Sequence, residues 1–172
     1  EIRHEANGVS LSIEIDGDTE IVEAEQVLVS TGRSPNTEGL GLEAAGVELT
    51  PKGGIEVDDL MRTTNPTIYA AGDVTGRHQF VYMAAYGAKL AVKNALNGNT
   101  HKYDAMAMPA VTFTDPQVAS VGLTEAVAAD QELEVKTSIL PLSYVPRALA
   151  ARDTRGLIKL VADAKTDKLL GA

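Results

Sequence analysis

The residues best suited to chemistry are Gly72 and Asp73, which end the apolar run 67–71. A buried strand that ends in Gly-Asp presents a carboxylate at the carboxyl edge of a sheet, where α/β folds bind ligands. Gly72 allows a ligand to approach the backbone closely, and ionised Asp73 can accept hydrogen bonds from ligand hydroxyl groups. The alternative is that Asp73 only caps a turn, which is common for Asp.

A helix is expected from about Val81 to Leu96, beginning a few residues after Asp73 and stopped by Asn97-Gly98. The free N–H groups and the positive dipole end of its first turn would stabilise negative charge. Val81 could therefore face an electron-rich ring while Asp73 holds a polyhydroxyl chain, although plain packing of the helix on a sheet explains the same sequence. The small and apolar residues that recur at helical spacing predict a close-packing face: Val81, Ala84, Ala88, Ala91, Val92 and Ala95.

The elements that must position this site are expected to form an α/β portion that ends at about residue 105. Alternating apolar residues around Asp16-Gly17-Asp18 predict an antiparallel hairpin over 9–22. The segments 27–29 and 67–71 are typical of strands buried on both faces. A strand is also expected over 55–58, and a short helix over 40–45 that is closed by Gly46.

A second portion with a different pattern is expected over 106–172. Strands and a helix segregate there as in an α+β interface domain. Thr124 is the expected N-cap of the helix, with Glu125 in its first turn. The expected strands are 110–113, 118–122, 135–140 and 156–161, followed by a polar turn over 163–167 that returns toward Leu169.

The composition excludes several classes of protein. The chain has 172 residues, 44% of them hydrophobic, and a net charge of −9. Such an acidic balance argues against a nucleic-acid or anionic-membrane surface, and no apolar run is long enough to span a membrane. The chain has no cysteine, which excludes a disulfide or a thiolate site within it and suits a cytoplasmic protein. Both ends fall inside strand-like sequence, so we expect an internal piece of a longer protein that is weakly stable alone.

Two strings of residues carry a resemblance to a known family. The string 27–36, Val-Leu-Val-Ser-Thr-Gly-Arg-Ser-Pro-Asn, and the string 67–74, Thr-Ile-Tyr-Ala-Ala-Gly-Asp-Val, resemble motifs of the pyridine nucleotide–disulfide oxidoreductases. Their order, about 40 residues apart, is far more specific than a lone glycine pattern. The resemblance implies that Asp73 binds the ribityl chain of FAD and that the backbone around Val81 meets the flavin ring. It places Gly32 on the nicotinamide-nucleotide side, although a turn that needs φ > 0 also explains that glycine.

Within this family, two stretches set the branch, 79–85 and 107–119, and Phe80-Val81-Tyr82 in the first resembles the mercuric reductase branch. The string Val145-Pro146-Arg147-Ala148-Leu149, followed by 153–156, also resembles that branch, although it is equally explained as a strand and turn of the interface domain. The branch implies a homodimer that uses NADPH, FAD and cysteine thiols to reduce Hg(II). Those thiols lie outside this chain in the family, so no catalytic residue is assigned within it.

Two other functions stay open. One is a dihydrolipoamide dehydrogenase-like flavoenzyme that uses NAD(H) and a dithiol, distinguished by a His-Glu pair in place of a terminal cysteine pair. The other is a non-enzymatic dimerisation module, which would fold as a dimer without flavin. His4, His78 and His101 are expected to be surface or loop histidines rather than metal ligands. Tyr82 and Tyr86 lie one helical turn apart and could touch flavin, although helix packing explains them as well. For Arg147, Arg152 and Arg155 we expect solvent or subunit contacts rather than anion binding.

Overall fold

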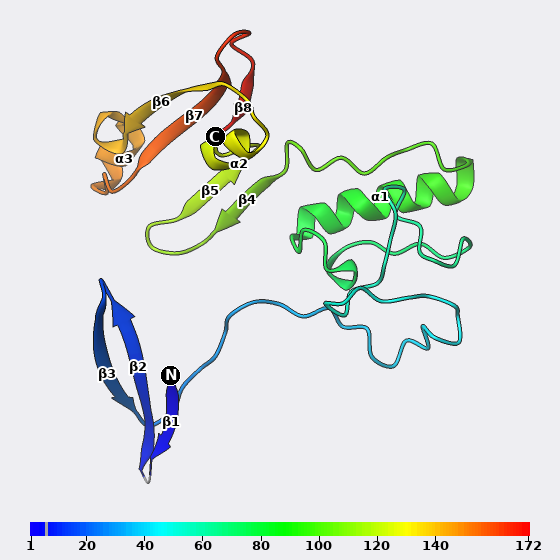
Figure 1. The fold of residues 1–172 in the computed structure, drawn as a ribbon, viewed down its shortest axis with the longest axis horizontal. Coiled ribbons are helices and arrows are strands. Elements are labelled where there is room, and N and C mark those ends of the chain that lie inside the picture. The colour runs from blue at the N-terminus through cyan, green and yellow to red at the C-terminus, as the bar shows by residue number, and fades with distance from the viewer. Residues whose placement is uncertain (6) are drawn as a thin grey trace. The chain divides into compact units, whose positions relative to one another are not determined.

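The first 33 residues and the remainder of the chain form two separate units, Glu1–Arg33 and Ser34–Ala172, in the computed structural model. The structure describes residues 1–5 and 7–172. Figure 1 shows the order of the elements along the chain. The boundary expected at about residue 105 lies inside the second unit and stays a prediction.

The first unit is an antiparallel three-stranded sheet in the order β1-β2-β3 (Figure 1). Its strands are β1 (Ile2–Glu5), β2 (Gly8–Ile15) and β3 (Asp18–Ala24). β2 and β3 pair from Val9 with Ala24 to Ile15 with Asp18, which confirms the predicted hairpin. Asp16 and Gly17 turn the chain with φ of 52° and 89°, as a tight hairpin turn requires.

The strand expected over 27–29 is absent, and that prediction is wrong. The segment has no regular structure, and the side chains of Leu28 and Val29 are 90% and 67% exposed. A buried strand needs a neighbouring strand to satisfy its N–H and C=O groups. None of the described strands pairs with this segment.

In the second unit, residues 34–80 form turns joined by isolated bridges. Leu49 pairs with Ile55, Val57 with Thr63, and Arg62 with Tyr69. The strands expected over 55–58 and 67–71 are therefore not formed. Only isolated residues of these segments are paired, at Ile55, Val57 and Tyr69. The pairing does not extend because the backbone turns between bridges, for example at Met61 with φ of 64°.

The short helix expected over 40–45 is a series of turns. Gly41 has φ of 65°, which is incompatible with a right-handed helix at that position. Gly46, with φ of 67°, ends the turns as expected. The helix prediction is wrong, whereas the stop at Gly46 is confirmed.

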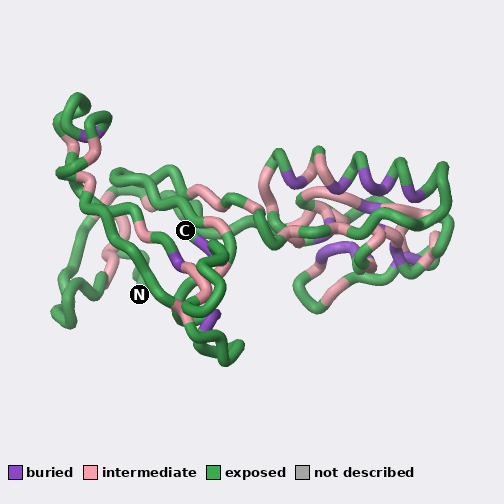
Figure 2. The backbone as a smooth tube through the Cα atoms, turned by 90° about the horizontal axis from the view of Figure 1, so that it is seen from above, coloured by how far each residue is buried: buried purple, intermediate pink, exposed green. Residues whose placement is uncertain are grey.

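The predicted long helix is α1 (Val81–Asn97), and Gly98 ends it in the left-handed conformation with φ of 80°. Its buried face differs from the expected one, because Val81 and Val92 are 83% and 58% exposed. Buried positions recur at helical spacing along this helix in Figure 2, and of the expected face only Ala91 is among them. The buried residues of α1 are Met83, Gly87, Leu90, Ala91 and Asn94. Gly87 decides which side is buried, since its missing side chain admits the sulfur of Met61 and the Cβ of Ala71 at 3.1 and 3.2 Å from a built Cβ.

The core beneath this helix is formed by side chains from the turns and from α1. Asn94 lies within it at 1% exposure, and its amide joins three backbone groups. Its Nδ2 donates to the carbonyl oxygens of Leu60 and His101, and its Oδ1 accepts from the His101 N–H. The buried apolar members of the core are Val47, Ile55, Val57, Met61, Ala70, Leu90 and Ala91.

Residues from 106 onward form the expected mixture of strands and helices. β4 (Pro109–Thr112) pairs with β5 (Val118–Val121), and a second sheet has the order β6-β7-β8 (Figure 1). Its strands are β6 (Val135–Pro141), β7 (Leu157–Asp163) and β8 (Leu169–Gly171). The helix α2 (Glu125–Asp130) begins as predicted, with the Thr124 side chain accepting from the Val127 N–H at 3.2 Å.

The segment expected as a strand and turn over 145–149 is instead a short helix, α3 (Pro146–Ala151). Pro146 occupies the first helical position, where its fixed φ and missing N–H suit a helix start. Ala148 is buried, and Arg152 ends the helix with φ of 55°. A single-turn 3₁₀ helix, η2 (Leu142–Tyr144), precedes it.

Candidate functional site

The predicted ligand-binding residues Gly72 and Asp73 form a sharp corner ahead of α1. Gly72 has φ of 82° and ψ of −159°, and Asp73 begins a 3₁₀ helix, η1 (Asp73–Thr75). That combination of angles is accessible essentially to glycine alone. The Asp73 side chain is exposed, so its carboxylate can accept hydrogen bonds from a ligand.

The corner lies directly against the first turns of α1. A Cβ atom built on Gly72 would lie 2.9 Å from the Cβ of Ala84, closer than real Cβ contacts come. Glycine is therefore needed here for two independent reasons, its backbone angles and the close approach of the helix. The structure brings Gly72 and Asp73 beside the helix that begins at Val81, as the sequence predicts.

The start of α1 carries no side-chain cap. Phe80, the N-cap residue, has extended angles and forms no capping hydrogen bond. Within the described part of the chain, the backbone N–H of Val81 donates to no backbone carbonyl, and Val81 is 83% exposed. Unsatisfied N–H groups and the helix dipole make such an end favourable for a negatively charged group. The Asp73 carboxylate, which can accept hydrogen bonds, and the start of α1, which favours an anion, thus lie on two elements that follow each other in the chain.

Two residues without a sequence motif fix this corner from inside. The Thr75 hydroxyl donates to the Gly72 carbonyl oxygen at 2.8 Å, and Thr75 is 4% exposed. The Arg77 guanidinium donates to the carbonyl oxygen of Val57 at 2.6 Å. Their contribution could not be found from the sequence, because their partners are backbone carbonyls rather than residue types in a pattern.

Gly32 belongs to the first unit, and the structure leaves its role a prediction. Its φ is 80°, and nothing lies within 4 Å of a Cβ built on it. The positive φ alone accounts for glycine at this position.

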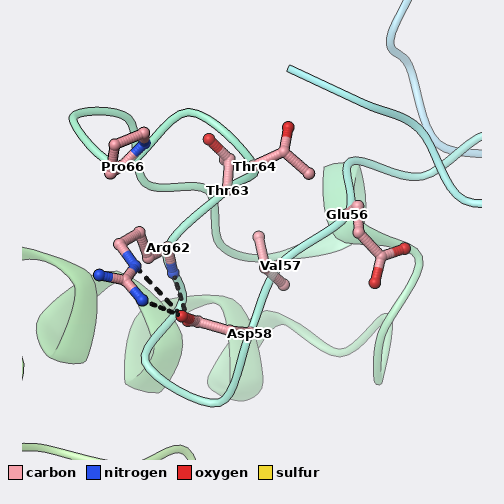
Figure 3. A pocket seen from close by; sticks show the side chains of 7 residues that line it. All are labelled: Glu56, Val57, Asp58, Arg62, Thr63, Thr64 and Pro66. Atoms are coloured by element: carbon pink, nitrogen blue, oxygen red, sulfur yellow. Dashed lines mark hydrogen bonds and ion pairs between the residues drawn. The ribbon is translucent and has the colours of Figure 1, made fainter. Parts of the chain in front are cut away.

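A surface hollow of about 420 Å³ lies elsewhere on the second unit (Figure 3). Asp58 and Arg62 form its charged pair, with 3.0 Å between Arg62 Nη2 and Asp58 Oδ2. Burial alone would raise the pKa of Asp58. Hydrogen bonds from the Arg62 and Leu60 N–H groups and from the Arg62 guanidinium outweigh this effect, so the pKa is lowered overall. The pair ties a turn together, and the hollow holds none of the predicted site residues. It is lined by Glu56, Val57, Asp58, Arg62, Thr63, Thr64 and Pro66.

Tyr82 and Tyr86, near the start of α1, contact neighbouring segments of the chain. Within residues 1–5 and 7–172, no cluster of His, Cys, Asp and Glu could hold a metal ion. The Tyr82 hydroxyl donates to the Pro109 carbonyl oxygen. Tyr86 packs against Tyr103 with ring centroids 5.3 Å apart, and its hydroxyl accepts from the Asp104 N–H at 3.2 Å.

None of the helices in the described part of the chain could cross a membrane.

Arg155 forms an ion-paired group with two carboxylates of the last portion. Its Nη2 lies 2.7 Å from Asp153 Oδ2 and 2.6 Å from Asp115 Oδ1. The hydrogen bond to Asp153 raises the pKa of Arg155, and the same bond lowers the pKa of Asp153 to about 2. The pairing joins the β4–β5 turn to the segment before β7, so Arg155 is satisfied within its own chain.

Comparison with known proteins gives a consistent result for both portions of the chain. Residues 1–89 match the family described as pyridine nucleotide-disulphide oxidoreductase, and residues 108–172 match the dimerisation domain of the same family. A mercuric reductase from Bacillus cereus is 55% identical over 160 residues, which cover 93% of this chain and 25% of the relative. A dihydrolipoyl dehydrogenase from Staphylococcus aureus is 42% identical over 166 residues, covering 96% of this chain and 35% of the relative.

A solved structure extends the likeness to three dimensions. The HOCl-induced flavoprotein disulfide reductase RclA from Escherichia coli matches with a TM-score of 0.81 and 32% identity, over 99% of this chain and 38% of that one. The chain therefore spans about a quarter to two fifths of the length of these relatives. The match supports the predicted fold class, a dinucleotide-binding α/β portion followed by an α+β interface portion.

Proposed function

The chain belongs to the pyridine nucleotide-disulphide oxidoreductase family, and from this premise we propose that it supplies part of the flavin site of a mercury(II) reductase. The observation that carries the proposal is the corner at Gly72 and Asp73 against the uncapped start of α1. The similarity to mercuric reductases, 55% identity in one case, supports the choice of Hg(II) as the substrate.

The residues present fit FAD. Gly72 leaves space that a Cβ would fill, which suits close approach of a ligand to the backbone. The exposed Asp73 carboxylate would accept hydrogen bonds from the ribityl hydroxyl groups. The N–H of Val81 and the positive end of α1 would stabilise negative charge on the pyrimidine side of the flavin ring. FAD, when bound, supplies the transfer of two electrons between a nicotinamide nucleotide and the acceptor.

The overall reaction proposed for the whole protein is the reduction of Hg(II) to Hg(0) by NADPH, with NADP⁺ and H⁺ as the other products. A soft thiolate is the ligand that suits Hg(II), and this chain contains no cysteine. The thiols of the proposed reaction would therefore come from other parts of the protein. The match of residues 108–172 to a dimerisation domain supports a homodimer.

The test uses the full-length protein purified with its flavin. We expect NADPH oxidation that requires Hg(II), and loss of bound FAD in the Asp73→Ala variant. NADPH oxidation that is independent of Hg(II), in a protein that binds flavin, would contradict the substrate assignment.

A second candidate is a dihydrolipoamide dehydrogenase-like enzyme with NAD(H) and a dithiol substrate. The 42% identity to a dihydrolipoyl dehydrogenase supports it. The two are distinguished by assaying the same preparation with lipoamide and NAD⁺, and with Hg(II) and NADPH. Turnover of lipoamide alone would favour the second candidate and leave the proposed flavin contacts unchanged.

A further inference from the structure

The corner that carries Asp73 has little rigidity of its own. Gly72 and Gly76 flank η1 with φ of 82° and 70°. Glycine has the widest choice of backbone angles, so a segment between two glycines must be fixed by other contacts. A site that binds a ligand tightly needs its polar groups held in place before the ligand arrives.

Thr75 supplies one of these contacts from inside the corner. Its hydroxyl donates to the Gly72 carbonyl oxygen at 2.8 Å and accepts from the backbone N–H of Arg77 at 3.2 Å. The side chain is buried, so water cannot replace these bonds readily. The hydroxyl thereby links the residue before Asp73 to the residue after Gly76.

Arg77 anchors the far end of the corner to a neighbouring segment. Its Nη2 and Nη1 donate to the carbonyl oxygens of Val57 and Asp58 at 2.6 and 3.5 Å. The Asp58 carboxylate is paired with Arg62 instead. A charged donor makes a stronger hydrogen bond to a carbonyl than a neutral donor does. A backbone hydrogen bond joins the same two segments: the Ile55 N–H donates to the Val74 carbonyl oxygen at 2.9 Å.

We infer that Thr75 and Arg77 are positioning residues that hold the Asp73 carboxylate in place for the flavin ribityl chain. They act through the backbone on either side of Asp73 and touch no reacting atom. The inference rests on the proposed flavin site and adds two residues that determine its affinity.

The experiment measures the dissociation constant of FAD for the full-length apoprotein by quenching of flavin fluorescence. Thr75→Val keeps the side-chain shape and removes the hydroxyl, and we expect about a 10-fold weaker affinity. Thr75→Ser keeps the hydroxyl and should restore affinity to within about 3-fold of wild type. Arg77→Met should weaken binding to a similar degree, and Arg77→Lys, which offers a single point donor, should fall between.

The control is Arg62→Met, which removes an arginine from the neighbouring segment that contains Val57 and Asp58. Arg62 bonds to Asp58 and not to the corner, so its loss should leave FAD affinity unchanged. Folding of each variant is checked by the thermal midpoint of the apoprotein. If Thr75→Val fails to fold, the comparison of Arg77→Lys with Arg62→Met decides the outcome.

A double-mutant cycle separates positioning from general stability. If Thr75 and Arg77 act through Asp73, adding either change to Asp73→Asn should weaken FAD binding by less than about 2-fold further. If each change instead weakened FAD binding by the same factor in Asp73→Asn as in wild type, the inference would be overturned. Wild-type protein that binds no FAD would instead overturn the proposed function. FAD binding that depends on Asp73 but is unaffected by Thr75→Val and Arg77→Met would overturn this inference alone.

Discussion

Gly72 and Ala84 are packed so closely that a Cβ atom on Gly72 would lie 2.9 Å from the Cβ of Ala84. This contact joins the turn that carries Asp73 to the helix that carries the N–H of Val81. The two proposed flavin contacts therefore lie on elements that pack directly against each other. A change at either residue of the contact should disturb both sides of the site together.

Gly72→Ala tests that support. We expect a loss of about 3 kcal/mol in the free energy of unfolding, because alanine is strained at these backbone angles and also meets Ala84. The measurement is the denaturant midpoint of the full-length apoprotein, together with its FAD content. Gly17→Ala is the matched control, since Gly17 has φ of 89° but nothing within 4 Å of a built Cβ. The control should lose only about 1 kcal/mol, and equal losses in both variants would contradict the role of the contact.

Asn94→Ala should be among the most destabilising changes in α1. The buried amide satisfies the carbonyls of Leu60 and His101 and the His101 N–H, and alanine would leave all three without partners. We expect a loss of about 3 kcal/mol, measured by denaturant unfolding. Asn97→Ala, at an exposed position of the same helix, should change stability by less than about 0.5 kcal/mol. A similar midpoint for the two variants would show that the buried amide contributes little.

Asp153 gives a prediction about pH. Hydrogen bonds from Arg155 lower its pKa to about 2 from an ordinary 3.8. Because the pKa is depressed in the folded state, the stabilisation is fully present above about pH 4 and is lost as the pH falls toward 2. Asp153→Asn should therefore be less stable than wild type at neutral pH, and the difference should shrink between pH 4 and pH 2.

The effect at Asp153 should be small, because the group is exposed and solvent screens it. The measurement is the difference in thermal midpoint between wild type and variant across that pH range. Asp130→Asn, an exposed position at the end of α2, serves as the control. If the difference in thermal midpoint between wild type and Asp153→Asn stayed constant from pH 7 to pH 2, the ion pair with Arg155 would not be its cause.

Elements fixed by local chemistry could be predicted from the sequence. The hairpin over 9–22 follows from alternation around a Gly turn, and α2 follows from the cap at Thr124, which bonds the Val127 N–H as expected. The Gly72-Asp73 corner is predicted from Gly-Asp together with the helix signal that follows it, although the segment 67–71 before it is not a strand. These features depend on residues close together in the chain.

Features that depend on distant partners could not be predicted. The segments 27–29 and 67–71 have strand-like composition, but pairing is decided by neighbours, and 27–29 has none among the described strands. The buried face of α1 is predicted only in part, at Ala91. Periodicity counts apolar residues, whereas Gly87 is buried through close approach of its neighbours and Asn94 through hydrogen bonding. Thr75 and Arg77 were missed because backbone carbonyls, which every residue has, are their partners.

The N–H of Val81 can be tested by removing it without removing the helix. Proline is tolerated at the first helical position because the N–H there has no intrahelical partner. Phe80 already has φ of −122° and ψ of 141°, angles that suit a residue before proline. Val81→Pro should therefore leave the stability of the apoprotein within about 0.5 kcal/mol of wild type.

The same variant should bind reduced FAD about 10-fold more weakly, since a hydrogen bond to an anionic group contributes about 1.5–3 kcal/mol. The loss should be larger for reduced than for oxidised flavin, because the reduced ring carries the negative charge, and so the midpoint potential of the bound flavin should fall. Val81→Ala keeps the N–H and should match wild type in both affinity and potential. An unchanged potential in Val81→Pro would mean that the start of α1 does not contact the flavin ring, and the role of Asp73 would then need independent support.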